Sequence, residues 1–411
     1  MIKKNEKGGI FMALLDNLEE AKCVQTVWGK LIPEKEAYQY AVRQIASFCA
    51  NLFQVMRILE PDYEKRTSAI CEISYQMNMA ASSEEYMKGF YDEWNIPEFC
   101  ERSSWLGAIF GDSGDEYENM AGRVIQFTRD RVEKELDTCP WDIVGSELCN
   151  MTTAMFTANF DLNSATGENE VALNMCEARG CGDRHCRVVA ERRDIYGQEK
   201  QGWMDHMNQP ACPVHDTPKE RMVKQGQIIR NGCYSNAFGE EKSFTWAYRW
   251  CMEKGWVWCV AFPLIAIRDM AESDEEFERI FKIVFSTAGK NAFIEPFAVE
   301  GLRSWLGVPR EIGDNDPRLM GGYIKNILDT QLVPCELEAF TEDEVRIRVD
   351  TETFNGRFPM APVEELTLGY ETLWHNMVKT MVSTEWSCWF EGKDDEEMII
   401  VVGRKIDKRM I

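Results

Sequence analysis

The strongest structural signal in the chain is Cys176-Glu-Ala-Arg-Gly-Cys181-Gly-Asp-Arg-His185-Cys186-Arg-Val-Val-Ala190. Three cysteines and one histidine fall within eleven residues, around two glycines. The β-branched segment that follows Cys186 predicts a strand. Glycines let a short loop fold back, so several soft ligands can converge. We therefore predict a hairpin whose turn holds a metal ion or a reactive thiol.

Cys176 and Cys186 lie ten residues apart and flank this turn, so a hairpin would bring both sulfurs within reach of one ion. A further ligand must come from elsewhere, and Cys149 or Cys139 is the upstream candidate. We predict a metal site formed by Cys176, Cys186 and Cys149, and zinc is the ion we expect. Iron or an iron–sulfur cluster, with Cys181 as another ligand, is the alternative.

Two other interpretations of the turn stay open. A reactive thiol without metal would make Cys181 the nucleophile, with Asp183 or His185 as the second reactive group. The thiols could instead be small apolar residues that fill the hairpin. The cysteines of the turn are not spaced as the paired Cys-x-x-Cys motifs of a zinc ribbon. Their spacing therefore does not decide between a metal site, a reactive thiol and apolar packing.

Charge and apolar patterning exclude several classes of protein. The net charge of −23 is unfavourable for nucleic-acid backbones and for anionic membranes. The longest apolar run, Gly255 to Ile267, is too short to span a bilayer and is expected to fill a core. The chain starts without an apolar leader, and its fifteen cysteines are scattered, so we expect a cytoplasmic protein with reduced thiols. A homo-oligomer is compatible with the sequence.

Helical patterns dominate the first part of the chain. Apolar residues recur at steps of three and four from Glu34 to Leu59, between Pro33 and Pro61, and predict a long helix. We predict further helices at about 64–80, 82–94 and 116–137. After Pro140 the pattern becomes β-branched and leads to the cysteine turn.

The second half repeats this order. Ser104-Trp-Leu-Gly107 returns as Ser304-Trp-Leu-Gly307, and the motif at Cys176 returns at Cys388, followed by Ile400-Val-Val. Residues 344–349 predict a strand, 366–381 a helix, and 387–390 and 398–402 two closing strands. We therefore predict an α/β (α+β) fold of two tandem modules, each with helices followed by a small, mainly antiparallel sheet.

The predicted division of the chain has four parts. They are an extended or disordered start at 1–16, module one with the cysteine turn at 17–198, an aromatic-rich connecting region at 199–290 that partly belongs to module two, and the core of module two at 291–411.

Tryptophans concentrate in the connecting region. Trp246 and Trp250 would lie close together on one helix face. Packing between modules accounts for most such aromatics, and a wall for a small apolar or aromatic ligand is the functional alternative.

The cysteine turn resembles the closing hairpin of the 4-vinyl reductase domain family, a superfamily that includes aminothiazoline-carboxylate hydrolase-like proteins and phenol-responsive sensors. The motif is Cys176-x-x-x-Gly180, then Gly182-Asp183-x-x-Cys186, and about fifteen residues in each half carry it. The resemblance implies an α/β module that encloses a small apolar or aromatic molecule, in some sensors beside zinc, with Cys176 and Cys186 matching the hairpin zinc ligands.

Two departures from the family pattern bear on this site. Leu173 stands where the sensors have a ligating glutamate, and the loop is longer by residues that include Cys181. In the second half Glu385 stands three residues before Cys388, but Ile399 replaces the closing cysteine. The second half is therefore expected to bind no metal of its own.

These patterns support three function classes. The first is a metal-assisted hydrolase or lyase acting on a small apolar or aromatic molecule, because the sequence carries no phosphate loop and nothing marks a flavin or nicotinamide site. The second is a non-catalytic carrier or sensor with a structural metal. The third is an iron–sulfur protein.

Overall fold

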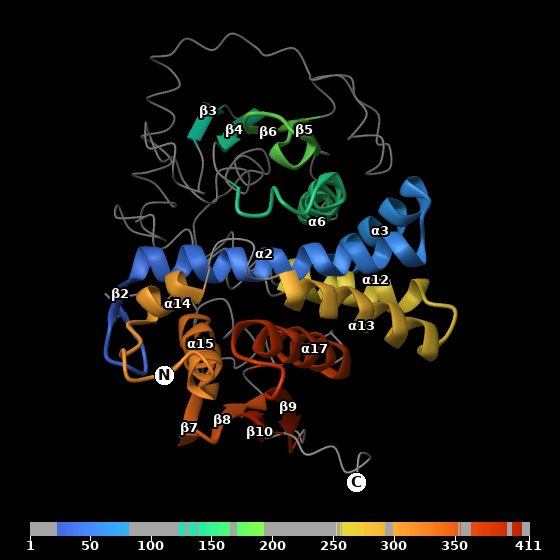
Figure 1. Ribbon diagram of the computed structural model, residues 1–411. Coiled ribbons are helices and arrows are strands. Elements are labelled where there is room, and N and C mark those ends of the chain that lie inside the picture. Colours follow the sequence, from blue (N-terminus) through green and yellow to red (C-terminus); the bar gives the residue numbers. More distant parts are fainter. Residues whose placement is uncertain are drawn as a thin grey trace, which may run out of the picture. The chain divides into compact units, whose positions relative to one another are not determined.

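The computed structural model in Figure 1 divides the chain into two compact units. Unit 1 comprises Met1–Glu20 and Asp62–Trp250, and unit 2 comprises Ala21–Pro61 and Cys251–Ile411. The structure describes residues 23–81, 123–127, 131–136, 139–164, 171–192, 252, 255, 257–291, 299–351, 354, 363–392 and 397–404.

The described part of unit 1 consists of two helices, one 3₁₀ turn and an antiparallel sheet. Its sheet has the strand order β3-β4-β6-β5. The described elements are α3 (Tyr63–Ala81), β3 (Arg123–Phe127), β4 (Arg131–Leu136), α6 (Ser146–Ser164), β5 (Val171–Glu177), the 3₁₀ turn η1 (Arg179–Cys181) and β6 (Cys186–Arg192).

Helix α6 is the scaffold of unit 1, because it packs against α3, β5 and η1. Polar side chains of α3 bond to carbonyls of α6: Ser74 donates to Met151 (3.1 Å) and Asn78 to Met155 (2.8 Å). A buried ion pair joins Arg66 Nη2 to Glu147 Oε1 at 2.8 Å. These contacts fix the helix that carries Cys149.

Unit 2 contains most of the described helices and a second antiparallel sheet, of order β7-β8-β10-β9. Its elements are β1 (Cys23–Gln25), β2 (Leu31–Pro33), α2 (Glu34–Leu59), the π-helical turn η2 (Val257–Ala261), α12 (Phe262–Met270), α13 (Asp274–Asn291), α14 (Val299–Leu306), α15 (Pro317–Thr330), β7 (Cys335–Phe340), β8 (Glu344–Asp350), α17 (Val363–Met381), β9 (Ser387–Glu391) and β10 (Glu397–Gly403).

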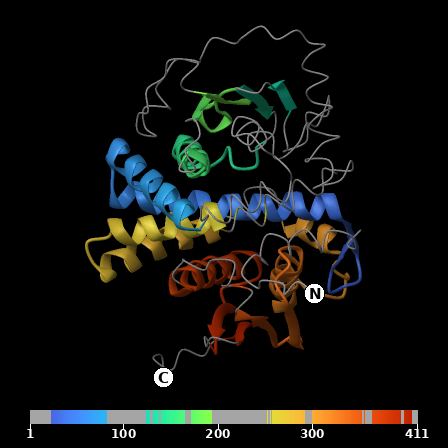
Figure 2. The same ribbon diagram turned by 180° about the vertical axis from the view of Figure 1, so that it is seen from behind.

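The core of unit 2 is layered. Helices α15 and α17 lie on the sheet, and α2, α12 and α13 lie beyond them, as both views show (Figures 1 and 2). Alternate residues of β8 face the helices, so Val345, Ile347 and Val349 are fully buried. Between the helices, the rings of Phe48 and Tyr370 stack with centroids 4.5 Å apart.

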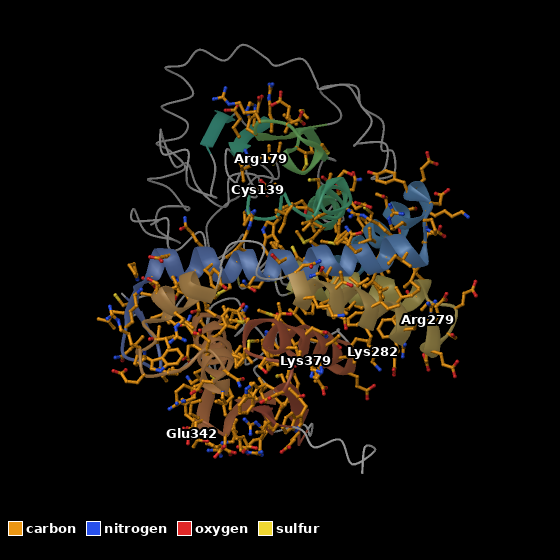
Figure 3. All side chains as sticks on the ribbon, in the orientation of Figure 1. Cys139, Arg179, Arg279, Lys282, Glu342 and Lys379 are labelled. Carbon is orange, nitrogen blue, oxygen red and sulfur yellow. The ribbon has the colours of Figure 1, made fainter. Side chains whose placement is uncertain are left out.

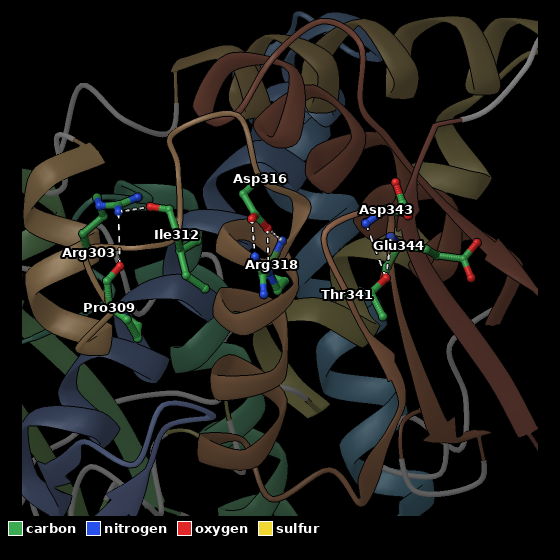
Figure 4. Close-up of polar contacts among 8 residues, drawn as sticks. All are labelled: Arg303, Pro309, Ile312, Asp316, Arg318, Thr341, Asp343 and Glu344. Atoms are coloured by element: carbon green, nitrogen blue, oxygen red, sulfur yellow. Dashed lines mark hydrogen bonds and ion pairs between the residues drawn. The ribbon is translucent and has the colours of Figure 1, made fainter.

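Local signals set the boundaries of the elements in unit 2 (Figure 4). Asp316 caps α15 by accepting a bond from the Arg318 backbone N–H (2.9 Å), and Pro317 occupies the first helical position. The Thr341 hydroxyl accepts a bond from the Glu344 N–H (3.1 Å) in the turn between β7 and β8.

Most predicted elements are confirmed. Helix α2 covers the predicted span from Glu34 to Leu59, and α3, α17, β6, β8, β9 and β10 match the other predictions made for the described residues. The apolar run before Ile267 forms η2 and α12 and fills the core, with Val260, Leu264 and Ile267 fully buried. The predicted helix at 82–94 lies outside the described residues.

The predicted helix from Glu116 to Asp137 is wrong. Residues Arg123–Phe127 and Arg131–Leu136 are instead the antiparallel strands β3 and β4. Met120, Val124 and Phe127 fit a helical period, but residues 131–136 pair in register with β6. Cross-strand pairing therefore overrides the weak helical pattern.

The α/β class with small antiparallel sheets is confirmed, and the two four-stranded sheets share one topology. Each has two strands, then a helix, then two strands, and the last strand lies between the second and third. This likeness accords with a duplication, which stays a prediction, because residues 104–107 of the repeated motif lie outside the described residues. Helix α2 groups with unit 2, so this division differs from the predicted boundary at 198.

Across the described helices, none combines the length and the apolar character that crossing a membrane requires.

Candidate functional site

Four thiols gather in unit 1, and they come from two separate segments. Cys139 precedes α6 and Cys149 lies in its first turns, whereas Cys181 ends η1 and Cys186 begins β6. Side-chain hydrogen bonds join Cys139 to Cys186 and Cys149 to Cys181. Each pair thus takes one thiol from each segment. Figure 3 labels Cys139 in the part of unit 1 between α6 and the sheet.

A close approach of backbone to side chain brings the segments together at Gly180. A Cβ atom at this position would lie 2.7 Å from Cys149 Sγ and 3.0 Å from the Gly145 carbonyl oxygen. Gly145 itself has φ +107°, which allows the chain to enter α6 directly after the turn. Glycine at 180 is therefore a condition for the contact between Cys149 and Cys181.

The hairpin turn is held by Asp183. Its carboxylate accepts a hydrogen bond from the Ala178 N–H at 2.8 Å, and the Asp183 and Cys181 N–H groups both donate to the Ala178 carbonyl (3.2 and 2.9 Å). Gly182 follows with φ +97°. Asp183 is thus positioned as an organiser of the turn, and its negative charge acts on Cys181.

Backbone N–H groups point at three of the four sulfurs. Trp141 donates to Cys139, Gly180 donates to Cys149, and Arg179 donates to Cys186 with an N···S distance of 3.4 Å. Hydrogen bonds to sulfur favour the thiolate over the thiol. The backbone therefore supplies the polar support that a bound or charged sulfur needs.

Within each pair one thiol has a raised pKa and the other has a lowered pKa. The hydrogen bond from Cys149 lowers the pKa of Cys181 to about 7, and the bond from Cys139 lowers the pKa of Cys186 to about 7. The same bonds, together with burial, raise the pKa values of the donors Cys139 and Cys149. Near neutral pH the cluster thus offers negative sulfur in both pairs.

Arg179 adds positive charge beside the cluster. Its guanidinium donates to Asp142 Oδ2 (3.1 Å) and to the Arg184 carbonyl (2.7 Å), which ties the segment before α6 to the hairpin turn. Its charge contributes to the lowered pKa of Cys186. Figure 3 labels this residue.

His185 belongs to a different set of contacts. Its Nε2 atom contacts Glu177 Oε2 closely and lies 3.5 Å from Glu135 Oε1. Of the three predicted catalytic residues, Cys181 and Asp183 therefore interact with each other, and His185 interacts with carboxylates of β4 and β5.

Cys176 lies where the ladder between β5 and β6 shifts register. Met175 pairs with Val188 and Glu177 pairs with Arg187, so Cys176 is the extra residue of a bulge. The negative charge of a Cys176 thiolate contributes to the raised pKa of Arg187. The Arg187 guanidinium donates a hydrogen bond to the buried Glu133. The predicted ligands Cys149 and Cys186 lie in the four-thiol cluster, together with Cys139, the alternative upstream candidate, and Cys181, predicted as a nucleophile or as a ligand of an iron–sulfur cluster.

The described residues contain no group of three or more histidine, cysteine, aspartate or glutamate side chains already arranged to hold an ion. The thiols stand as two neighbouring pairs. Sulfur sets of this kind are chemically suited to zinc and iron. The predicted aromatic wall, Trp246 and Trp250, lies outside the described residues.

No protein-family model, curated protein or solved structure matches this chain.

Proposed function

We propose that unit 1 binds one metal ion, zinc, through Cys139, Cys149, Cys181 and Cys186. The observation that carries this proposal is the meeting of four thiols from two separate segments in two hydrogen-bonded pairs. Thiolate is the form that binds soft or borderline metals, and four of them make a common structural zinc site.

Three features support the proposal on physical grounds. A metal ion would replace the protons shared within each pair, and the two pairs would have to draw together around it. The N–H groups of Trp141, Gly180 and Arg179 are placed to stabilise negative sulfur. Cysteines that only packed the interior as small apolar side chains would not need these N–H donors.

The number of protein ligands separates the two function classes. Four cysteine ligands leave no open position, which favours a carrier or sensor with a structural ion. Cys181 is the exposed thiol of the four. If only three cysteines bind, water or substrate could take the fourth position, which would favour a hydrolase or lyase.

Metal analysis of single serine variants tests the site. Cys139→Ser, Cys149→Ser, Cys181→Ser and Cys186→Ser are each expected to reduce zinc bound per chain and to weaken its affinity. Cys176→Ser is the matched control from the same hairpin and is expected to retain the ion. Retention in the four variants with loss in the control would refute the assignment.

The spectrum of anaerobically purified protein distinguishes the metals. A colourless protein with one zinc per chain supports the proposal. Brown colour with iron and acid-labile sulfide would select the iron–sulfur alternative, which the same four thiols could hold.

We also propose, from Trp246, Trp250 and the family resemblance, that the protein binds a small apolar or aromatic molecule. Native mass spectrometry of freshly purified protein would detect such a ligand. Trp246→Ala and Trp250→Ala are expected to release it, and a chain that never carries or takes up an aromatic compound would contradict this part.

A further inference from the structure

A lysine, an aspartate and a cysteine meet at the end of α15 in unit 2. Lys325 and Asp329 lie one helical turn apart, and Cys335 is the first residue of β7. Asp329 Oδ1 accepts a close hydrogen bond from Lys325 Nζ and a second bond from Cys335 Sγ at 3.5 Å. Lys325 also hydrogen-bonds to Cys335. The amine and the thiol therefore share one carboxylate oxygen and contact each other.

The backbone fixes this contact from both sides. After α15, the Gln331 N–H donates to the Ile327 carbonyl and the Val333 N–H to the Leu328 carbonyl, both at 2.9 Å. The Asp350 N–H then bonds to the Pro334 carbonyl at 3.1 Å, next to Cys335. The thiol is thus held near the helix by main-chain bonds as well as by the carboxylate.

The resting chemistry of Cys335 excludes two simpler roles. Burial raises the pKa of its thiol to about 12, so the resting group is a neutral thiol, which is unsuited to bind a metal ion. An ion pair between Lys325 and Asp329 alone would not need a thiol. The side chains of Lys325 and Asp329 are 15% and 31% exposed, so a small oxidant has access to the group.

We propose that Lys325 and Cys335 form a modification site, at which oxidation joins Nζ to Sγ through one oxygen atom. With hydrogen peroxide as oxidant the step is R–SH + R′–NH₃⁺ + 2 H₂O₂ → R–S–O–NH–R′ + 3 H₂O + H⁺. The S–H bond and two N–H bonds break, S–O and N–O bonds form, and the peroxide is reduced to water. Asp329 holds both groups, and the released proton passes to solvent.

The bridge would join the end of α15 to the edge strand β7. It differs from the irreversible acids of cysteine oxidation because a thiol reductant returns the free thiol and amine. A neutral thiol reacts with peroxide more slowly than a thiolate does. The reaction is therefore expected to be slow and to require excess hydrogen peroxide.

Peptide mapping after peroxide treatment of the full chain tests this proposal. The expected product is a cross-linked pair of peptides containing Lys325 and Cys335, heavier by about 14 Da because one oxygen is gained and two hydrogens are lost. Dithiothreitol is expected to reverse it. Asp329→Asn is expected to lower its yield several-fold.

Two variants and one control make the result specific. Lys325→Arg keeps the positive charge beside Asp329 but removes the amine, and Cys335→Ser removes the thiol; both are expected to abolish the product. Cys23→Ser removes an exposed thiol of the same unit and is expected to leave it intact. The proposal is overturned if Cys335 gains only oxygen, by about 16 or 32 Da, without a link to Lys325, or if the product persists in Lys325→Arg.

Discussion

Cys181 is the exposed member of the four-thiol cluster, and its pKa of about 7 depends first on the hydrogen bond from Cys149. The thiolate is the reactive form, so a thiol that ionises at lower pH reacts faster at neutrality. The Asp183 charge and partial burial act in the opposite direction. One neighbouring thiol therefore controls whether Cys181 is reactive.

The pH dependence of alkylation tests this control. In metal-free protein the rate at Cys181 is expected to rise with pH to a half-maximum near pH 7. Cys149→Ala removes the donor, so the thiolate forms only at higher pH and the rate at pH 7 falls about tenfold. Quantitative mass spectrometry with iodoacetamide measures both, with Cys176→Ser as control. An unchanged midpoint in Cys149→Ala would contradict the paired arrangement.

Asn326 differs from Cys181 in that its buried side chain makes no hydrogen bond within the described structure. Its side chain is 1% exposed on α15, and within the described structure neither amide atom has a hydrogen-bond partner. Burying such an amide is unfavourable. Asn326→Leu, which keeps the branched shape of the side chain, is expected to raise the free energy of unfolding of unit 2 by about 1 kcal/mol.

Chemical denaturation monitored in unit 2 measures this change. Asn326→Asp is the matched comparison and is expected to destabilise, because it buries a charge at the same place. A loss of stability in Asn326→Leu would mean that an ordered water molecule or another group supports the amide.

At this scale the sequence predicts part of the site. Cys149 and Cys186 are predicted from the density of thiols and the hairpin. The pairing of Cys181 with Cys149 depends on the approach of Gly180 to α6, a contact between segments distant in sequence that no local pattern encodes. Cys139 is foreseen only as an alternative for the same reason.

Two helices of unit 2 cross without room for a side chain. A Cβ atom at Gly289 of α13 would lie 2.4 Å from the Leu373 carbonyl oxygen of α17 and 2.7 Å from Asn376 Cβ. Asn376 also donates to Ser286 at 3.0 Å across the same interface. The obstacle is mainly backbone, so the helices must move apart to admit a methyl group.

Gly289→Ala is therefore expected to lower the free energy of unfolding by about 1–3 kcal/mol, despite the better helix propensity of alanine. Gly313→Ala is the control in the same unit, because a Cβ there would meet no described atom within 4 Å. Equal stability of the two variants in urea titrations would show that the helices yield freely.

A buried ion pair, Arg66–Glu147, joins helices α3 and α6. The side chains of Arg66 and Glu147 are 7% and 5% exposed, so removal of one partner leaves a charge buried. Glu147→Ala is expected to cost about 3–5 kcal/mol in unit 1. The double change Arg66→Met/Glu147→Leu removes both charges and is expected to cost much less, as hydrogen exchange in α3 and α6 would report. A larger cost for the double change would contradict this account.

Element types follow from sequence where a pattern is long or clearly alternating. Helix α2, with 26 residues between two prolines, and the alternating strand β8 are both predicted. Strands β3 and β4 are not, because their few apolar residues also fit a helical period, and only the pairing of β4 with β3 and β6 decides between helix and strand. Short elements therefore depend on partners that the sequence does not display locally.

At the scale of the whole chain, all four proposed ligands belong to unit 1. Removal of zinc by a chelator is expected to accelerate hydrogen exchange in α6 and β6 and to leave α17 and β10 of unit 2 unchanged. Hydrogen-exchange mass spectrometry with and without chelator makes the comparison. Faster exchange in unit 2 alone would contradict the placement of the ion.

The sequence does not predict which segments of the chain form each unit. Linear modules follow from the repeated motifs, but α2 groups with segments more than two hundred residues later through contacts with α12 and α13. Aromatic packing, such as that of Phe48 with Phe285 and Tyr370, holds this grouping together. Which distant apolar faces meet is a property of the folded chain.

Strand β7 forms one edge of the sheet in unit 2, and an exposed edge is a template for aggregation. Here the edge is interrupted by a register shift between Leu337 and Ala339 and carries the charged side chains of Glu336 and Glu338, both exposed. A second chain that tried to add a strand would meet a kinked backbone and like charge. The glutamates that pair with Arg348 are therefore expected to disfavour the addition of a strand from a second copy of the chain at high protein concentration.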